Sequence, residues 1–238
     1  MSRAFAALLL TAAVFIAAPS HANEAAVRQA FIARFPGANI DSVTRMPIGG
    51  LYEIVFEGQI VYTDEKVNYV MSGNLFDLRG GTERNLTRER MGQIVSQTLA
   101  KSNEGAIKRV KGNGKRVIYT FEDPNCPYCK ELQKELAKMN DVTVYTFLLP
   151  ILSQDSTDKS KAIWCSKDRA KAWDDAMLRG VTPAPARKDC ETPFDKNAQL
   201  AQRFGIRGTP AVYLANGQQI GGYVPADKIE QALSTAAR

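Results

Sequence analysis

The chain has 238 residues, of which 45% are hydrophobic and 24% are charged, and its formal net charge at pH 7 is +6. This apolar content is too high, and the net charge too small, for an intrinsically disordered protein. A polytopic membrane protein is excluded as well, because the only long apolar stretch lies at the N-terminus. The length allows one or two domains with at least one sizeable hydrophobic core.

The N-terminal apolar stretch is typical of a cleaved secretory signal. Arg3 supplies a positive charge, residues 4–18 are apolar but too few to span a bilayer comfortably, and Ser20-His21-Ala22 resembles a cleavage site. We expect cleavage after residue 22 and export without stable membrane insertion. Because the sequence contains a single histidine, in the signal, the exported chain lacks the histidine of a catalytic triad or a His-ligated metal site.

Residues 23–81 predict a small N-terminal dimerisation domain. A helix that ends at Pro36-Gly37 is followed by four strand-like runs separated by turn residues. These runs lie at residues 51–56, 59–63, 67–71 and 74–78. So small a unit buries little surface and an open antiparallel meander leaves a strand edge unpaired, which favours self-association. The alternative is a small monomeric domain docked on the rest of the chain.

Residues 82–113 predict a linker helix followed by a hinge. Thr87 is placed to cap the helix. Its apolar stripe, at i, i+4 and i+8, consists of Met91, Val95 and Leu99. Between residues 108 and 116, Gly112 and Gly114 lie among five basic residues. We interpret this segment as a solvated joint. Elsewhere Lys and Arg are interleaved with Asp and Glu, which argues against a nucleic-acid partner.

Residues 114–238 predict an α/β domain with the order βαβ, then helices, then ββα. Asn216-Gly217 is a strong signal for a tight hairpin between two of its strands. The expected elements are a strand at 117–121, a helix at 126–139, a strand at 142–149, helical segments at 157–180 and 194–204, strands at 211–214 and 218–221, and a helix at 226–237.

The chemistry of this domain is concentrated in Cys126-Pro127-Tyr128-Cys129. A C-x-x-C motif that follows a strand and opens a helix is typical of a thiol–disulfide redox centre. The free amides and the dipole at the helix N-terminus favour thiolate over thiol at Cys126. Cys129, one turn further on, is placed to attack a mixed disulfide at Cys126. We therefore expect a redox-active pair with Cys126 as the nucleophile and Cys129 as the resolving thiol.

Two other interpretations of the four cysteines are less favourable. A zinc site would need Cys165 and Cys190 as ligands, and these two lack the close spacing of a second metal knuckle. A purely structural Cys126–Cys129 disulfide would close so tight a loop that it would stabilise little. Neither a metal nor another cofactor is expected.

Two motifs resemble the thioredoxin superfamily: Phe-Glu-Asp-Pro-Asn-Cys-Pro-Tyr-Cys-Lys at 121–130 and Gly-Thr-Pro-Ala-Val at 208–212. A narrower signal is Ala-Ile-Trp-Cys-Ser-Lys-Asp at 162–168, followed by Trp-Asp-Asp-Ala-Met at 173–177. With these runs the chain resembles the bacterial periplasmic DsbC/DsbG family of thiol:disulfide isomerases over essentially its whole exported length.

This resemblance implies a V-shaped homodimer, in which cystatin-like N-terminal modules pair and linker helices carry two thioredoxin-like domains, with helical insertions, that face a cleft. It implies a membrane reductase of the DsbD type that keeps Cys126 and Cys129 reduced. It also makes Thr209-Pro210 the cis-proline loop beside Cys126. Together with Tyr128 this loop would contact the substrate, and the backbone of Thr209 could pair with an extended substrate segment.

The chain departs from the family pattern in two ways. Pro-Tyr between the cysteines is found in DsbG-type proteins rather than in the best-known isomerase, whereas DsbG-type catalytic domains lack a second cysteine pair, which is present here. The buried acid that thioredoxins carry six residues before the nucleophile corresponds to Thr120. This removes one proton acceptor for Cys129 and leaves Glu122 or Asp123 as weaker candidates.

Cys165 and Cys190, which lie 25 positions apart, are interpreted as a structural disulfide. Closing such a loop is worth about 3–4 kcal/mol in the chain-entropy model. A second redox couple is the alternative, but neither cysteine opens a motif that would favour its thiolate.

The sequence thus predicts a periplasmic protein disulfide isomerase, a thiol–disulfide oxidoreductase that reduces and isomerises incorrect disulfides in misoxidised or unfolded exported proteins. The alternatives are a DsbG-like reductase of oxidised single thiols and a holdase chaperone whose cleft binds unfolded chains without chemistry.

Overall fold

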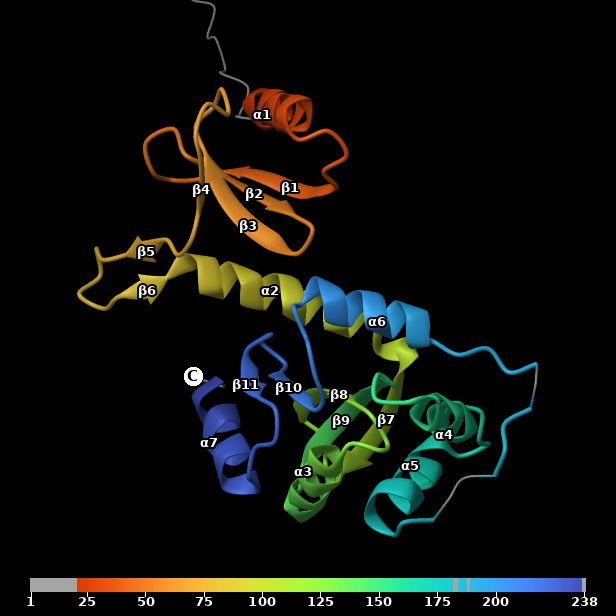
Figure 1. The fold of residues 1–238 in the computed structure, drawn as a ribbon. Coiled ribbons are helices and arrows are strands. Elements are labelled where there is room, and N and C mark those ends of the chain that lie inside the picture. Colours follow the sequence, from red (N-terminus) through yellow and green to blue (C-terminus); the bar gives the residue numbers. More distant parts are fainter. Residues whose placement is uncertain (1–20, 182–183, 188, 237–238) are drawn as a thin grey trace, which may run out of the picture. The chain divides into compact units, whose positions relative to one another are not determined.

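The computed structural model describes residues 21–181, 184–187 and 189–236. The chain divides into two compact units, Met1–Ser72 and Gly73–Arg238 (Figure 1). The expected signal segment lies outside the described residues, apart from its last two positions, which begin the first helix. The division after residue 72 precedes the boundary at residue 81 that the sequence suggests.

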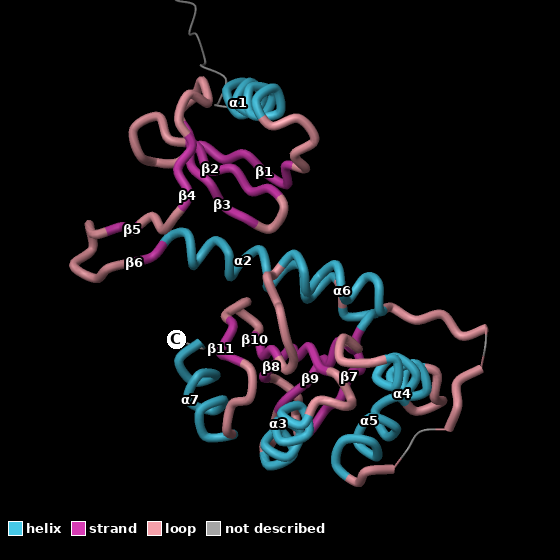
Figure 2. Tube along the Cα trace, in the orientation of Figure 1, coloured by secondary structure: helices cyan, strands magenta, loops and turns pink. Residues whose placement is uncertain are grey.

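The first unit is a helix on a four-stranded antiparallel meander. Its elements are α1 (His21–Arg34), β1 (Ile40–Arg45), β2 (Tyr52–Phe56), β3 (Gln59–Thr63) and β4 (Val70–Ser72), and the strands pair in chain order. Val27 and Phe31 of α1 are buried against Tyr52 and Ile54 of the central strand. The expected helix and meander are therefore present (Figure 2).

Two strands of this meander differ from the sequence expectation. β1 was not predicted, because a bulge between Ile40 and Ser42 interrupts its alternation of apolar and polar residues. The run expected at 67–71 becomes a strand only at Val70. Before it, the Asp64 carboxylate accepts the N–H groups of Asn68 (2.7 Å) and Tyr69 (2.9 Å). These bonds hold a loop in place of a strand ladder.

The second unit is built on a five-stranded sheet with the order β11-β10-β8-β9-β7. Its strands are β7 (Ala106–Lys111), β8 (Arg116–Glu122), β9 (Val142–Leu148), β10 (Ala211–Leu214) and β11 (Gln219–Gly221). β8 and β9 are parallel and are joined by α3 (Pro127–Lys138), as the βαβ pattern predicts, whereas the other neighbours are antiparallel.

Helices cover both faces of this sheet (Figure 1). α2 (Leu86–Lys101) and α6 (Phe194–Arg203) lie on the face that presents Phe121 and Phe147. On the opposite face lie α3, α4 (Gln154–Trp164), α5 (Arg169–Leu178) and α7 (Ala226–Ala236). Because successive side chains of a strand point to opposite faces of the sheet, alternate residues of the strands pack into the cores on its two faces.

The segment expected to be a hinge is instead an edge of the sheet. β7 pairs with β9 from Ala106 to Lys111, and a turn through Gly112 and Gly114 leads directly into β8. The basic residues of the segment fit this position, because charged side chains on an edge strand discourage pairing with other chains. A Cβ at Gly112 would lie 2.2 Å from a carboxylate oxygen of Asp141, so the turn requires glycine there.

The residues before α2 also differ from expectation. β5 (Phe76–Asp77) pairs with β6 (Arg84–Asn85) in a separate two-stranded ribbon, so the run expected at 74–78 does not extend the meander. The helix cap is Asn85, whose side chain accepts the N–H of Arg88 at 2.9 Å. Thr87, the expected cap, accepts the N–H of Leu75 instead. Within the described ranges, no helix is long and apolar enough to cross a membrane.

Candidate active site

Cys126 and Cys129 lie where β8 gives way to α3. Cys126 precedes the helix with an extended backbone, at φ −72° and ψ 119°, and Pro127 is the first helical residue. Proline fits this position because the N–H that it lacks would have no partner inside the helix. Cys126 is 4% exposed and Cys129 is 0% exposed, so a substrate disulfide meets Cys126 first.

The sulfur of Cys126 is bonded to a loop from much later in the chain. Its thiol donates to the carbonyl oxygen of Thr209 at 3.2 Å, and the Thr209–Pro210 peptide bond is cis. In the described structure, no hydrogen bond joins the Cys126 side chain to the amides of the first helical turn, which it was expected to face. Tyr128, between the cysteines, is 66% exposed.

Cys129 is held as a thiol by its surroundings. Burial, and after it the negative charge of Glu122, raises the pKa of the Cys129 thiol above its ordinary value. Cys126 acts in the same direction, and a hydrogen bond with the backbone of Asp123 acts in the opposite one. Because the thiolate is the nucleophile in disulfide exchange, Cys129 needs to lose its proton before it attacks.

Glu122 ends β8 and is 0% exposed. The side-chain amide of Gln133 on α3 donates to its carboxylate at 2.6 Å. Burial raises the pKa of Glu122, whereas hydrogen bonds from Thr120, Gln133 and Thr146 and the charge of Arg109 lower it. A buried carboxyl therefore lies beneath the first turns of the helix that carries the cysteine pair.

Asp123, which follows Glu122 in the chain, hydrogen-bonds to backbone groups of two loops. Its carboxylate accepts the N–H groups of Asn125 (2.8 Å), Ile151 (2.9 Å) and Leu152 (3.1 Å). These bonds tie the loop before Cys126 to the loop after β9, since the carboxyl ends of parallel strands meet at one sheet edge.

A second tie joins the loop to α4. Asn125 donates to Asp155 at 2.7 Å and accepts from Lys159 at 2.9 Å, while Lys159 and Asp155 form an ion pair at 2.7 Å. Together with the Asp123 bonds, this triangle fixes the backbone that presents Cys126.

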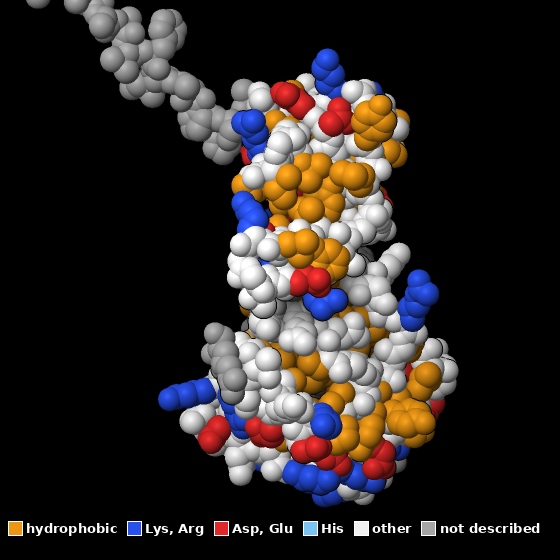
Figure 3. Space-filling view, turned by 90° about the vertical axis from the view of Figure 1, so that its left-hand side faces the viewer, with side chains coloured by type: hydrophobic (Ala, Val, Ile, Leu, Met, Phe, Trp, Pro, Cys, Tyr) orange, Lys and Arg blue, Asp and Glu red, His pale blue; other side chains and the backbone are white. Residues whose placement is uncertain are grey.

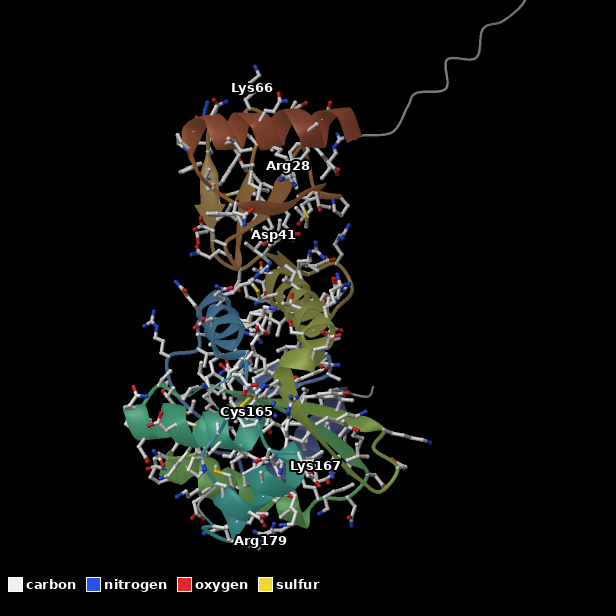
Figure 4. The ribbon with its side chains drawn as sticks, turned by 90° about the vertical axis from the view of Figure 1, so that its right-hand side faces the viewer. Arg28, Asp41, Lys66, Cys165, Lys167 and Arg179 are labelled. Atoms are coloured by element: carbon white, nitrogen blue, oxygen red, sulfur yellow. A yellow bond between two sulfur atoms is a disulfide. The ribbon has the colours of Figure 1, made fainter. Side chains whose placement is uncertain are left out.

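Cys165 and Cys190 form a disulfide with an S–S distance of 1.97 Å. Cys165 directly follows α4 (Figure 4), and Trp164 before it donates its indole N–H to the carbonyl of Glu191 at 3.1 Å. Cys126 and Cys129 are free thiols. Among the residues that the structure describes, no group of three or more His, Cys, Asp or Glu side chains could hold a metal ion.

Comparisons with known proteins identify the family. A model of the thioredoxin-like domain matches residues 104–237, and a model of the disulfide bond isomerase N-terminal domain matches residues 18–88. The probable thiol:disulfide interchange protein DsbC of Bordetella pertussis is 44% identical over 209 residues, which cover 87% of this chain and 73% of that protein. The chain belongs to the DsbC family. DsbC of Salmonella typhimurium is 31% identical over 228 residues, which cover 94% of this chain and 92% of that protein.

Membership of the DsbC family confirms the expected fold class, an N-terminal DsbC-type domain followed by a thioredoxin-like domain, and the enzyme class, a thiol–disulfide oxidoreductase. A crystal structure of a disulfide interchange protein from Neisseria gonorrhoeae is similar to part of the chain. It has a TM-score of 0.52 and 40% identity, and the match covers 56% of this chain and 96% of that one.

Sequence reasoning missed several polar residues around the pair. Gln133 lies four residues after Cys129, so helical periodicity alone places both side chains on one face of the helix. A polar residue on that buried face could have indicated a buried polar partner near the cysteine pair. Arg109 and Thr146 reach Glu122 only through the pairing of β7, β9 and β8. No local pattern in the sequence indicates that register.

Proposed function

We propose that the chain is a periplasmic enzyme that reduces and isomerises incorrect disulfides in exported proteins through Cys126 and Cys129. The observation that supports this most directly is the unequal placement of the two thiols. Cys126 lies at the helix start against the Thr209 carbonyl, and Cys129 is fully buried behind it. The relatives named thiol:disulfide interchange proteins support the same reaction.

The reaction begins when the Cys126 thiolate attacks one sulfur of a substrate disulfide. The substrate S–S bond breaks, its other sulfur leaves as a thiolate, and a mixed disulfide forms at Cys126. In isomerisation, a second substrate thiolate attacks the mixed disulfide, which regenerates Cys126 and leaves a new substrate pairing. In reduction, Cys129 attacks Cys126, the substrate leaves fully reduced, and the Cys126–Cys129 pair is oxidised.

The surface around Cys126 suits an unfolded polypeptide. Thr209 and Pro210 offer backbone beside the sulfur for pairing with an extended segment, and Tyr128 offers an exposed ring. On the loop that Asp123 holds, Ile151 and Leu152 are 50% and 54% exposed. Apolar side chains around a reactive sulfur favour substrates that expose their own apolar residues.

Continued reduction needs an electron donor. Each reductive cycle leaves Cys126 and Cys129 as a disulfide, which cannot attack a substrate. We infer that a membrane reductase of the DsbD type restores the thiols. A leader at residues 1–22 would deliver the chain to the periplasm, where the Cys165–Cys190 disulfide is stable.

The first unit is proposed to pair two copies of the chain. β4 is one of the two edge strands of its sheet, and Tyr69, just before it, and Val70 and Met71 within it are exposed large hydrophobic residues. Figure 3, which faces the β4 side, shows apolar side chains gathered on this unit. A second copy would cover this edge and these side chains.

The test is the recovery of activity by a scrambled multi-disulfide protein in a glutathione buffer. We expect Cys126→Ser to lose all catalysis, and Cys129→Ser to accumulate mixed disulfides while it retains part of the isomerisation. Cys165→Ser/Cys190→Ser is the matched control and should remain active. Full recovery with Cys126→Ser would overturn the proposal in favour of a holdase. Reduction of sulfenic acids without any isomerisation would favour the DsbG-like alternative.

A further inference from the structure

We propose that Asp123 is a positioning residue that sets the affinity of the enzyme for unfolded polypeptides. Its carboxylate holds the loop between β9 and α4, residues 149–153, so that Ile151 and Leu152 contact the polypeptide that is joined to Cys126. The inference rests on the proposed function and adds a determinant of substrate affinity to its first step. Asp123 acts here through hydrogen bonds to backbone, and the thiol chemistry stays with the two cysteines.

Asp123 lies one hydrogen bond away from both the nucleophile and the loop. Its backbone carbonyl accepts the N–H of Cys126 at 3.0 Å. One oxygen of its carboxylate accepts the N–H of Asn125 at 2.8 Å, and the other accepts those of Ile151 (2.9 Å) and Leu152 (3.1 Å). A single residue, itself 0% exposed, therefore fixes the backbone of the loop next to the backbone of Cys126.

The middle of the loop depends on this carboxylate. The loop follows β9 directly and ends at Ser153, which caps α4. Between these ends, Pro150 has no N–H to donate, and the N–H groups of Ile151 and Leu152 are the two that Asp123 accepts. Without the carboxylate, these N–H groups would need water as their partner, because an unpaired buried N–H is costly. The loop would then leave its place beside Cys126.

The nucleophile has further supports that the middle of the loop lacks. The side chain of Asn125, directly before Cys126, also bonds to Asp155 and Lys159 of α4. The Cys126 thiol donates to the carbonyl of Thr209, and the residue itself begins α3. Loss of the Asp123 carboxylate is therefore expected to displace Ile151 and Leu152 more than the sulfur of Cys126.

The exposed side chains of the loop fit one occupant, the polypeptide that flanks the attacked disulfide. Ile151 and Leu152 are exposed large hydrophobic residues, as is Tyr128 between the two cysteines. When Cys126 forms the mixed disulfide, the neighbours of the substrate cysteine are held covalently at this surface. In an unfolded protein these neighbours include apolar side chains that a native fold would bury, and contact with the loop removes them from water. A small disulfide has no such neighbours.

The test compares two substrates of the reduced full chain that release the same aromatic thiolate. One is a small aromatic disulfide, and the other is an unfolded polypeptide whose single cysteine, flanked by apolar residues, is joined to that aromatic thiol. For Asp123→Ala we expect the half-saturating concentration of the polypeptide to rise at least roughly tenfold, because apolar contact area is lost. The rate with the small disulfide should fall less than roughly threefold, because its reaction needs only the sulfur of Cys126.

Further variants make the result specific. Asp123→Asn keeps the volume of the side chain and one of its two acceptor oxygens, so it should raise the half-saturating concentration by a smaller factor. Ile151→Ser/Leu152→Ser removes the contact itself from an exposed loop and should match Asp123→Ala. Combining the three substitutions should bring no further rise, because they remove one shared contact. Asp158→Asn, on the exposed side of α4 where Gln154 donates to Asp158, is the matched control and should behave as the wild type.

The outcomes separate this assignment from the proposed function. Equal losses on both substrates in Asp123→Ala would overturn the assignment, and so would an unchanged half-saturating concentration in Ile151→Ser/Leu152→Ser or in both Asp123 variants. A wild type that releases the aromatic thiolate from neither substrate would overturn the proposed function instead.

Discussion

Glu122 and Asp123 are adjacent in the chain, and the sequence offers no reason to choose between them as a proton acceptor. The structure separates them by the two-residue period of β8, which turns Glu122 toward α3 and Asp123 toward the loop after β9. One carboxyl is thereby buried beside a thiol, and the other organises backbone. Two adjacent carboxyls thus have different surroundings because they face opposite sides of the chain.

The pH dependence of stability follows from the burial of Glu122. Burial raises the pKa of Glu122 in the folded chain. The contribution of the neutral Glu122 to the free energy of unfolding is therefore fully present below the pKa of the unfolded chain, about 4.3. That stability is lost as pH rises through the folded pKa. The glutamine in the Glu122→Gln variant carries no titratable proton, so the stability of the variant lacks this pH dependence. We therefore expect the melting temperature of the variant, relative to the wild type, to increase between pH 4.5 and pH 8.

The measurement is thermal unfolding of both oxidised proteins across that pH range. A relative shift of about 2–4 °C corresponds to about 1 kcal/mol for a chain of this size. Glu131→Gln serves as the control and should show no such trend. A constant offset between Glu122→Gln and the wild type at all pH values would contradict the argument.

At the residue scale, the C-x-x-C pair and the Thr209-Pro210 loop could be singled out from the sequence, because a motif and a family resemblance both point to them. The structure adds that Cys126 donates to the Thr209 carbonyl. Gln133 and Arg109 were not found, because their importance arises only when α3 and β7 are laid on the sheet.

At the scale of elements, long periodic segments were predictable and an edge strand was not. The helix at α3 and the parallel pair β8 and β9 match the sequence expectation to within a residue or two. The segment at 108–116, which includes the second half of β7, was taken for a hinge because Gly112 and Gly114 lie there among five basic residues. Lys108 is exposed, as is typical of an edge strand, whereas Arg109 turns inward and donates to Asp174 and Thr146. Ala106 and Ile107 enter the hydrophobic core.

The Cys165–Cys190 disulfide acts at this scale, because it links the end of α4 to the segment before α6. Replacement of both cysteines by serine should lower the free energy of unfolding by about 3–4 kcal/mol, the loop entropy that the crosslink removes. Denaturant unfolding measures this loss. Disulfide exchange should persist at temperatures where the variant stays folded. Loss of exchange in a folded variant would contradict a structural role.

At the scale of the whole molecule, we expect the exported chain to be a homodimer joined through its first unit. Light scattering should give twice the monomer mass, and a fragment that begins at Gly73 should be monomeric. A fragment that begins at Lys115 would be unsuitable, because it lacks α2 and β7, which belong to the second unit. A monomeric full chain at micromolar concentration would contradict the proposal.

A pair of variants locates the contact. Met71→Lys places a charge on the exposed edge strand β4 and should weaken the dimer at least roughly tenfold, about 1.4 kcal/mol. Val110→Lys makes the same change on β7, the edge of the other sheet, where Val110 is likewise exposed, and should leave the dimer intact. Equal weakening by both variants would argue against a contact specific to β4.

The pairing of the four cysteines bears on how the chain matures. Cys126 and Cys129 are neighbours in order along the chain, and so are Cys165 and Cys190. For the proposed exported chain, we expect an oxidant that joins each thiol to the preceding free one to form Cys126–Cys129 and Cys165–Cys190 and no crossed pair. We therefore expect the chain to mature without the help of a disulfide isomerase.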